Sequence, residues 1–143
     1  MTNLMNLDYD YDGVVANQIR TYAHIGMFES PPAEEAIADL PTVPDPTDSS
    51  QPLELRARSY MNSNCAHCHQ PLGSAVSAIL RDLRYETPLI DTALCTGVVA
   101  GNAEASELWI QVDELKMPPI AVHVPDHDAK VVREWLAELQ SCP

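Results

Sequence analysis

The stretch "NSNCAHCHQPLG", Asn62 to Gly73, places two cysteines and two histidines within five consecutive positions. A helix is predicted to lead into it over residues 52–68, with Ser50 as the N-cap residue. The apolar and small side chains along one side of that helix are Leu53, Ala57, Tyr60, Met61 and Asn64. Three kinds of site use cysteines this closely spaced: a zinc site, a redox-active dithiol and a covalent anchor for a prosthetic group.

The first two kinds of site fit the sequence poorly. A structural zinc site usually combines two separated pairs of ligands. Cys65 and Cys68 make one such pair, but Cys95 and Cys142 lie far apart and neither has a partner at that spacing. A thioredoxin-like dithiol follows a strand and opens a helix. Cys65 and Cys68 are instead predicted to continue and end a helix.

The order Cys65, Ala66, His67, Cys68, His69 is the C-x-x-C-H pattern of covalent haem attachment. Two thiols one helical turn apart can form thioether bonds to one haem, and the adjacent His69 can then bind the iron, which leaves His67 as a bystander.

A second axial ligand is expected at a distance along the chain, and Met117 in "LKMPPI" is the candidate because two prolines stiffen its loop. The alternatives are a core role for Met117 and ligation by His123 or His127.

The rest of the chain is predicted to be mostly α-helical. Residues 12–28 are predicted to form a helix capped by Asp12, with Val15, Ile19, Tyr22 and Gly26 on one face, and prolines make residues 29–52 an extended arm. A short helix is expected near 74–80 and another over 102–115, capped by Asn102 with Leu108, Val112 and Leu115 inward. The last helix, over 126–140, is capped by Asp126 and has its apolar side at Val131, Val132, Trp135, Leu136 and Leu139.

Charge and hydropathy exclude some classes of function. The net charge of −13, from 21 acidic and 8 basic residues, argues against nucleic-acid binding. Residues 1–50 carry nine acids and one base, so this part is either a solvated acidic face or a surface that attracts a basic partner. We expect no membrane span, because no apolar run is long enough. Residues 1–13 lack the features of a secretory signal, so we expect a mature form or an excised piece.

Several stretches resemble the class I c-type cytochromes, and more narrowly a bacterial group of secreted mono-haem domains often found at the end of larger proteins. They are "RARSYMNSNCAHCH", "DLRYETPLIDTALC", "GNAEASELW" and "MPP" before the closing helix, and, upstream, "VANQIRTYAHIGMF" and "LPTVPDPTD". The resemblance implies a mostly α, haem-wrapping fold, in which residues 1–50 form a helix and a Pro-rich acidic arm packed on a haem c domain of residues 51–143.

The resemblance also implies one covalently bound haem c. Cys65 and Cys68 would form the thioether bonds, and His69 and Met117 would be the axial ligands of the iron. The helix before the motif would cross the last helix, with Ala57 permitting close approach and Tyr60 and Trp135 filling the contact. Candidate partners of the haem propionates are Arg81, Arg84 and Trp109.

A haem c protein matures in an oxidising compartment, so Cys95 and Cys142 are expected to pair; the alternative is two buried free thiols.

The expected function is electron transfer to or from a redox partner protein, a periplasmic or extracellular oxidoreductase, with no enzyme activity of its own. Alternatives are a haem enzyme of peroxidase type with an open or labile distal site, and an acidic docking module of a larger secreted redox protein. We expect a periplasmic or secreted monomer, or part of a multidomain protein.

Overall fold

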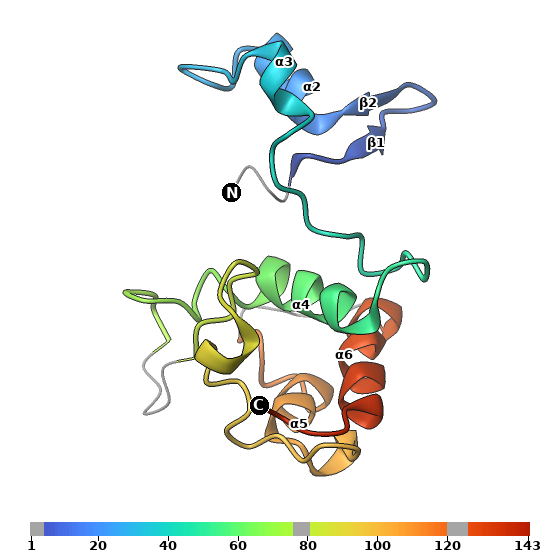
Figure 1. Cartoon of the computed structure of the whole chain (residues 1–143), viewed down its shortest axis with the longest axis vertical. Helices are drawn as coiled ribbons and strands as arrows, with labels where there is room; N and C mark the ends of the chain where they lie inside the picture. Colours follow the sequence, from blue (N-terminus) through green and yellow to red (C-terminus); the bar gives the residue numbers. More distant parts are fainter. Residues whose placement is uncertain (1–4, 76–80, 120–125) are drawn as a thin grey trace. The chain divides into compact units, whose positions relative to one another are not determined.

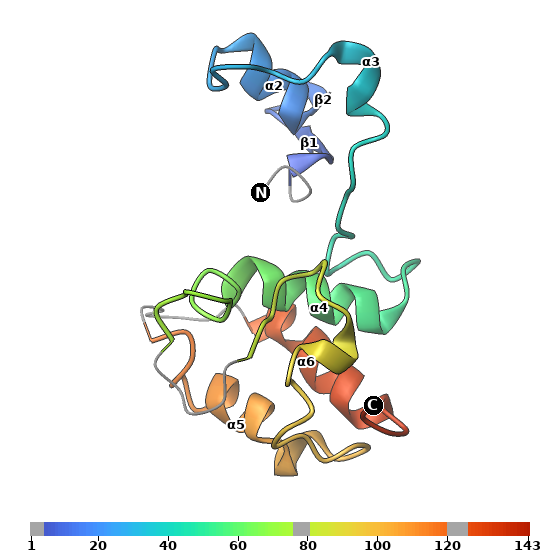
Figure 2. The same ribbon diagram turned by 60° about the vertical axis from the view of Figure 1, so that its left-hand side comes forward.

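The structure is a computed structural model that describes residues 5–75, 81–119 and 126–143 (Figures 1 and 2). It is mainly helical with one two-stranded sheet, which confirms the predicted mostly α class. The chain divides into two compact units, Met1–Val43 and Pro44–Pro143. Among the described residues, no helix combines the length and the apolar character needed to cross a membrane.

The first unit begins with an antiparallel hairpin of β1 (Asp8–Asp10) and β2 (Val15–Asn17). Helix α2 (Gln18–His24) follows directly, and Asn17 caps it by accepting hydrogen bonds from two backbone N–H groups. The predicted helix start at Asp12 was therefore wrong. Asp12 and Gly13 form the turn of the hairpin with φ of 60° and 89°, and Val15 is in a strand, which suits its β-branched side chain.

A short helix, α3 (Glu34–Ile37), completes this unit and contacts α2. Ile19 of α2 and Ile37 of α3 are both buried, whereas Val15 and Gly26, predicted to share a helical face with Ile19, are exposed. The residues from Pro44 onward belong to the second unit. Two side chains of helix α4 (Leu53–Asn64) contact them: Ser59 donates a hydrogen bond to the carbonyl of Pro44, and Arg56 donates one to the carbonyl of Pro46.

The second unit is built on the contact between α4 (Leu53–Asn64) and α6 (Asp126–Glu138), which lie next to each other in Figures 1 and 2. Helix α6 also contacts α5 (Glu107–Asp113) and the 3₁₀ turn η2 (Ala103–Ala105). Another 3₁₀ turn, η1 (Leu89–Asp91), lies in the loop between α4 and α5. Ala57 is fully buried in one cluster with Tyr60 and Trp135, as expected for a close crossing. The predicted apolar side of α6 is confirmed at Val131, Val132, Trp135 and Leu136, with Leu139 partly buried.

Two predicted helices are shorter than expected. Helix α4 has Pro52 at its N-cap and ends at Asn64, while Ser50 hydrogen-bonds Asp48 instead of capping the helix. The helix predicted over 102–115 is broken at Ser106.

The break at Ser106 comes from its own side chain. Its buried hydroxyl donates to the carbonyl of Asn102 at 2.8 Å and accepts from the backbone N–H of Val99 at 3.0 Å, which compete with helical hydrogen bonding. Asn102 does cap η2, as predicted. Leu115 was expected to face inward, but it lies beyond the end of α5 with φ of 56° and is exposed, and Trp109 is buried in α5 instead. Most of the helix expected over 74–80 falls outside the described residues.

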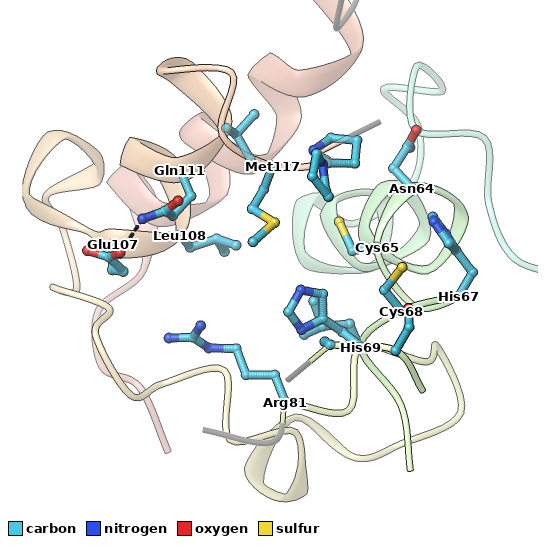
Figure 3. Close-up of a pocket in the computed structure, with 16 residues that line it drawn as sticks. Asn64, Cys65, His67, Cys68, His69, Arg81, Glu107, Leu108, Gln111 and Met117 are labelled. Atoms are coloured by element: carbon cyan, nitrogen blue, oxygen red, sulfur yellow. Dashed lines mark hydrogen bonds between the residues drawn. The ribbon is translucent and has the colours of Figure 1, made fainter. Parts of the chain in front are cut away.

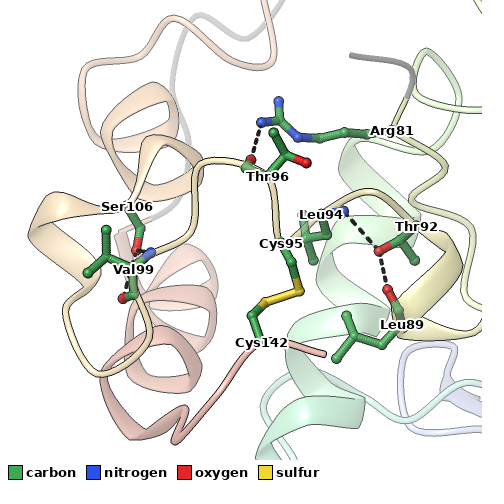
Figure 4. The surroundings of a disulfide bond; sticks show 9 residues. All are labelled: Arg81, Leu89, Thr92, Leu94, Cys95, Thr96, Val99, Ser106 and Cys142. Atoms are coloured by element: carbon green, nitrogen blue, oxygen red, sulfur yellow. Dashed lines mark hydrogen bonds between the residues drawn. A yellow bond between two sulfur atoms is a disulfide. The ribbon is translucent and has the colours of Figure 1, made fainter.

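Cys95 and Cys142 form a disulfide with a Cα–Cα distance of 5.6 Å, which confirms the predicted pairing (Figure 4). The bond joins the segment after α6 to the loop between η1 and η2. Thr92 stiffens this loop, because its hydroxyl donates to the carbonyl of Leu89 and accepts from the N–H of Leu94. The end of the chain is thus fastened to a segment far from it in sequence.

Replacing both Cys95 and Cys142 by Ser is expected to lower the free energy of unfolding by about 4 kcal/mol, because the bond closes a loop with a sequence separation of 47. Urea denaturation measures the loss. Adding reductant should destabilise the native chain to a similar degree and leave the variant unchanged. Alkylation of both sulfurs without prior reduction would contradict the pairing.

Ala57→Leu tests the helix crossing. Because Ala57 is fully buried between two packed helices, the larger side chain is expected to lower the free energy of unfolding by about 1–3 kcal/mol. The matched control is Ala137→Leu, at an exposed position of α6, for which we expect a change within about 0.5 kcal/mol. Equal effects in denaturation curves would show that the crossing tolerates a larger residue.

Candidate functional site

Residues 65–69 form a tight turn at the C-terminal end of α4. The N–H of Cys65 donates to the carbonyl of Met61 at 2.8 Å, and the N–H groups of Cys68 and His69 both donate to the carbonyl of Cys65. The backbone of Cys65, with φ of −122°, has already left the helix. The prediction that both cysteines continue the helix was therefore wrong, and the two thiols are instead presented by a turn.

The chain then folds back onto this turn. The N–H of Ala75 donates to the carbonyl of Cys68, and the N–H of Leu83 to the carbonyl of His69. Gly73 permits the approach, since a Cβ at this position would lie 2.2 Å from the carbonyl oxygen of Cys68. The sequence reasoning missed this role of Gly73, although the "PLG" that follows the motif is a turn signal.

The turn forms one wall of a cavity of about 300 Å³, at the lower end of the volumes typical of small-molecule sites (Figure 3). Cys65, Cys68 and His69 line it from one side, and Met117 lines it from the loop after α5. In Figure 3 the Met117 side chain extends into the space from above and the His69 ring lies below it. The structure therefore brings together the four residues selected from the sequence, which come from two distant segments. The remaining wall is largely apolar, with Leu83, Leu108, Val112 and Pro118 among its residues.

His67, expected to be a bystander in the motif, also lines this cavity and is exposed. His123 lies outside the described residues, and so does the side chain of His127.

The environment of His69 favours a neutral imidazole. Burial lowers the pKa of His69, and the positive charges of Arg81 and His67 lower it further. Its Nδ1 atom is buried without a hydrogen-bond partner. A neutral ring is the form of histidine that binds a metal.

The environment of Cys65 disfavours the dithiol alternative. Burial raises the pKa of the Cys65 thiol to about 12, with a further contribution from Cys68. A catalytic dithiol needs the opposite, a thiolate stabilised near neutral pH, often by the N-terminus of a helix. Cys65 lies at a helix C-terminus, where the partial charge is negative.

Outside the motif, the charged residues that line the cavity in the described part of the chain are Arg81 and Glu107. Arg81 donates from Nη2 to the carbonyl of Thr96 at 2.7 Å, while its Nε is buried without a partner. Glu107, at the start of α5, accepts a hydrogen bond of 2.5 Å from Gln111. Cationic and anionic side chains thus both line the cavity.

Of the three propionate candidates named from the sequence, Arg81 alone is among the described residues that line the cavity. Arg84 is engaged elsewhere: it contacts both oxygens of Asp82 and lies 3.8 Å from Glu86. Hydrogen bonds from Arg84 lower the pKa of Asp82 to about 2, so this pair is ionised over the whole useful pH range. Trp109 is buried in the core.

The residues present fit a haem. In the described part of the chain three buried side-chain polar atoms lack a partner, and two of them, His69 Nδ1 and Arg81 Nε, belong to this cavity. An apolar chamber with soft ligands and one cation suits a flat apolar group that carries a metal and anionic substituents. Cys65 and Cys68 could hold its edge, and His69 and Met117 could bind its iron.

A bare metal ion has less support. Within residues 5–75, 81–119 and 126–143, no three His, Cys, Asp or Glu side chains are grouped so that they could hold one. A haem iron, in contrast, needs two protein ligands.

Comparison with known proteins gives no further guide to the site: no protein-family model, no curated protein and no solved structure matches this chain.

Gly73→Ala tests the return of the chain onto the motif. Because the added Cβ would meet backbone atoms of Cys68 and Gln70, we expect a loss of about 1–3 kcal/mol in the free energy of unfolding. Leu72→Gly is the control: Leu72 is exposed and has a φ of 65°, which glycine adopts readily, so no comparable loss is expected. Denaturation curves of both variants provide the measurement, and unchanged stability of Gly73→Ala would contradict the close approach.

Proposed function

We propose that this chain is an electron carrier of cytochrome c-like fold, with one haem c attached through Cys65 and Cys68. The observation that carries the proposal is the convergence of the C-x-x-C-H residues and the distant Met117 on one largely apolar cavity. The thioether spacing requires two thiols on one turn, and the hydrogen bonds of residues 65–69 provide it.

His69 and Met117 are the proposed axial ligands. The lowered pKa of His69 favours the neutral imidazole, in which one ring nitrogen carries no proton and is available for binding. The thioether of Met117 is a neutral, soft ligand that raises the reduction potential of the group it binds. When bound, haem c supplies a reversible one-electron couple. With both axial positions taken by the chain, no position is left for a substrate, which favours electron transfer over bond-making chemistry.

The chain's other residues orient the group and limit the access of water. Leu83, Leu108 and Val112 provide the apolar wall, and Arg81 provides a cation. Met117 itself is 38% exposed, so its side of the cavity is close to the surface, where a partner can approach.

The proposed partner is a redox protein with a basic docking face. The net charge of −13 would attract such a protein and make its association sensitive to salt. The Cys95–Cys142 disulfide is typical of an oxidising compartment, so the proposed location is periplasmic or extracellular.

A peroxidase is the second candidate, and Glu107 is the observation in its favour, because it is a carboxylate on the wall of the cavity. Its side chain is exposed and hydrogen-bonded to Gln111, and Met117, as the proposed second ligand, would occupy the position that peroxide needs. Rapid peroxide turnover together with a five-coordinate spectrum would favour this candidate over electron transfer.

The axial ligands are tested on protein exported together with a haem-attachment system. The native chain is expected to show a low-spin, six-coordinate spectrum in both oxidation states. Met117→Ala should lose methionine ligation and have a lower reduction potential, because a thioether favours the reduced iron.

Met27→Ala is the matched control, since Met27 is exposed and lies in the other unit, and it should leave spectrum and potential unchanged. Native ligation in Met117→Ala would remove Met117 from the site. Failure of the native chain to acquire any haem would overturn the proposed function.

A further inference from the structure

The loop that carries Cys95 contacts both charged residues of the cavity outside the motif. Next to the disulfide, the carbonyl of Thr96 accepts the hydrogen bond from Arg81 Nη2 at 2.7 Å (Figure 4). The carbonyl of Gly97 accepts a hydrogen bond of 2.8 Å from the N–H of Glu107. Thr96 therefore contacts the side chain of the cationic Arg81, and the next residue, Gly97, contacts the backbone of the anionic Glu107.

Glycine at position 97 allows the two charged residues to lie this close to the loop. A Cβ there would lie 3.1 Å from Cβ of Glu107 and 3.5 Å from Nη2 of Arg81. Its φ of 86° is also one that other residues rarely adopt. The position of both side chains therefore depends on the conformation of residues 95–97.

That conformation depends in turn on the end of the chain. The bond to Cys142 fastens Cys95 to the segment that follows α6, and α6 is packed in the core. On the other side, the hydroxyl of Ser106 accepts a hydrogen bond of 3.0 Å from the N–H of Val99. The loop is therefore held at both ends. Arg81 retains one buried donor, Nε, that has no partner in the part of the chain that the structure describes.

We propose that residues 95–97, fastened by the Cys95–Cys142 disulfide, position Arg81 and Glu107 as two opposed charges that set the reduction potential of the group bound in the cavity. Arg81 directs its free Nε to a carboxylate of that group and favours the reduced form. Glu107 favours the oxidised form, with a smaller effect because it is exposed to solvent. This inference rests on the proposed function, and it assigns a role at the site to a disulfide remote from the motif in sequence.

The test measures the potential of the haem-loaded protein by spectroelectrochemical titration. Arg81→Gln is expected to lower the equilibrium constant for reduction about tenfold, which is about 59 mV for a one-electron couple. Glu107→Gln keeps an acceptor for Gln111 and should raise that constant about two- to threefold. Arg84→Gln is the matched control, because Arg84 binds Asp82 and Glu86 instead of lining the cavity, and it should leave the potential unchanged.

The role of the disulfide is tested with a double-mutant cycle. Cys95→Ser/Cys142→Ser is expected to lower the potential of the native chain and to have little effect in the Arg81→Gln background. Gly97→Ala, which retains the disulfide, should also lower the reduction potential. This variant tests the loop if Cys95→Ser/Cys142→Ser does not fold.

An equal decrease in both backgrounds would overturn the inference, as would unchanged potentials in Arg81→Gln and Glu107→Gln. Both results leave a low-spin His/Met spectrum intact and are thereby distinguished from failure of the proposed function, in which no haem is attached.

Discussion

The packing of α4 against α6 is the contact on which the rest of the second unit depends. Helix α4 delivers the cysteine turn at its C-terminal end, and α6 is followed by Cys142. Ala57 of α4 and Trp135 of α6 are both buried in the core cluster at this crossing. A change in the relative position of these helices would therefore move the cavity wall and the fastened loop together, although the two lie in different parts of the sequence.

The candidate site is built from short segments, and none of them would indicate a cavity by its sequence alone. Hydrogen bonds to the carbonyl of Cys65 shape the turn, and Gly73 lets the chain return over it. Met117 comes from a loop whose shape two prolines restrict. No single segment forms the cavity, and two of its buried polar atoms have no hydrogen-bond partner among the described residues.

Short-range patterns were the part of the structure that the sequence predicted well. The apolar side of α6 follows from its helical period, and the selection of Cys65, Cys68 and His69 follows from covalent spacing. Local competition produced the errors. Asp12 and Gly13 form a hairpin turn in place of a helix start, and Ser106 bonds to the backbone and interrupts a helix.

Whether Arg81 or Arg84 lines the cavity depends on tertiary structure, because it is decided by the groups that contact each side chain. Part of the answer was visible in the sequence, however, since Arg84 has an acid two residues away on either side, and it contacts both Asp82 and Glu86. The role of Gly73 required knowledge of which backbone lies opposite it.

The burial of Cys65 also bears on how four cysteines in one small chain are kept in two separate chemical roles. Thiolates, and not thiols, attack disulfides. Burial raises the pKa of the Cys65 thiol to about 12, which keeps it protonated at neutral pH in the folded chain before any thioether bond forms. Cys65 is therefore a poor attacker of the Cys95–Cys142 bond, and scrambling through this thiol is slow once the chain has folded. The wall that suits an apolar group thus also protects the correct pairing of the cysteines.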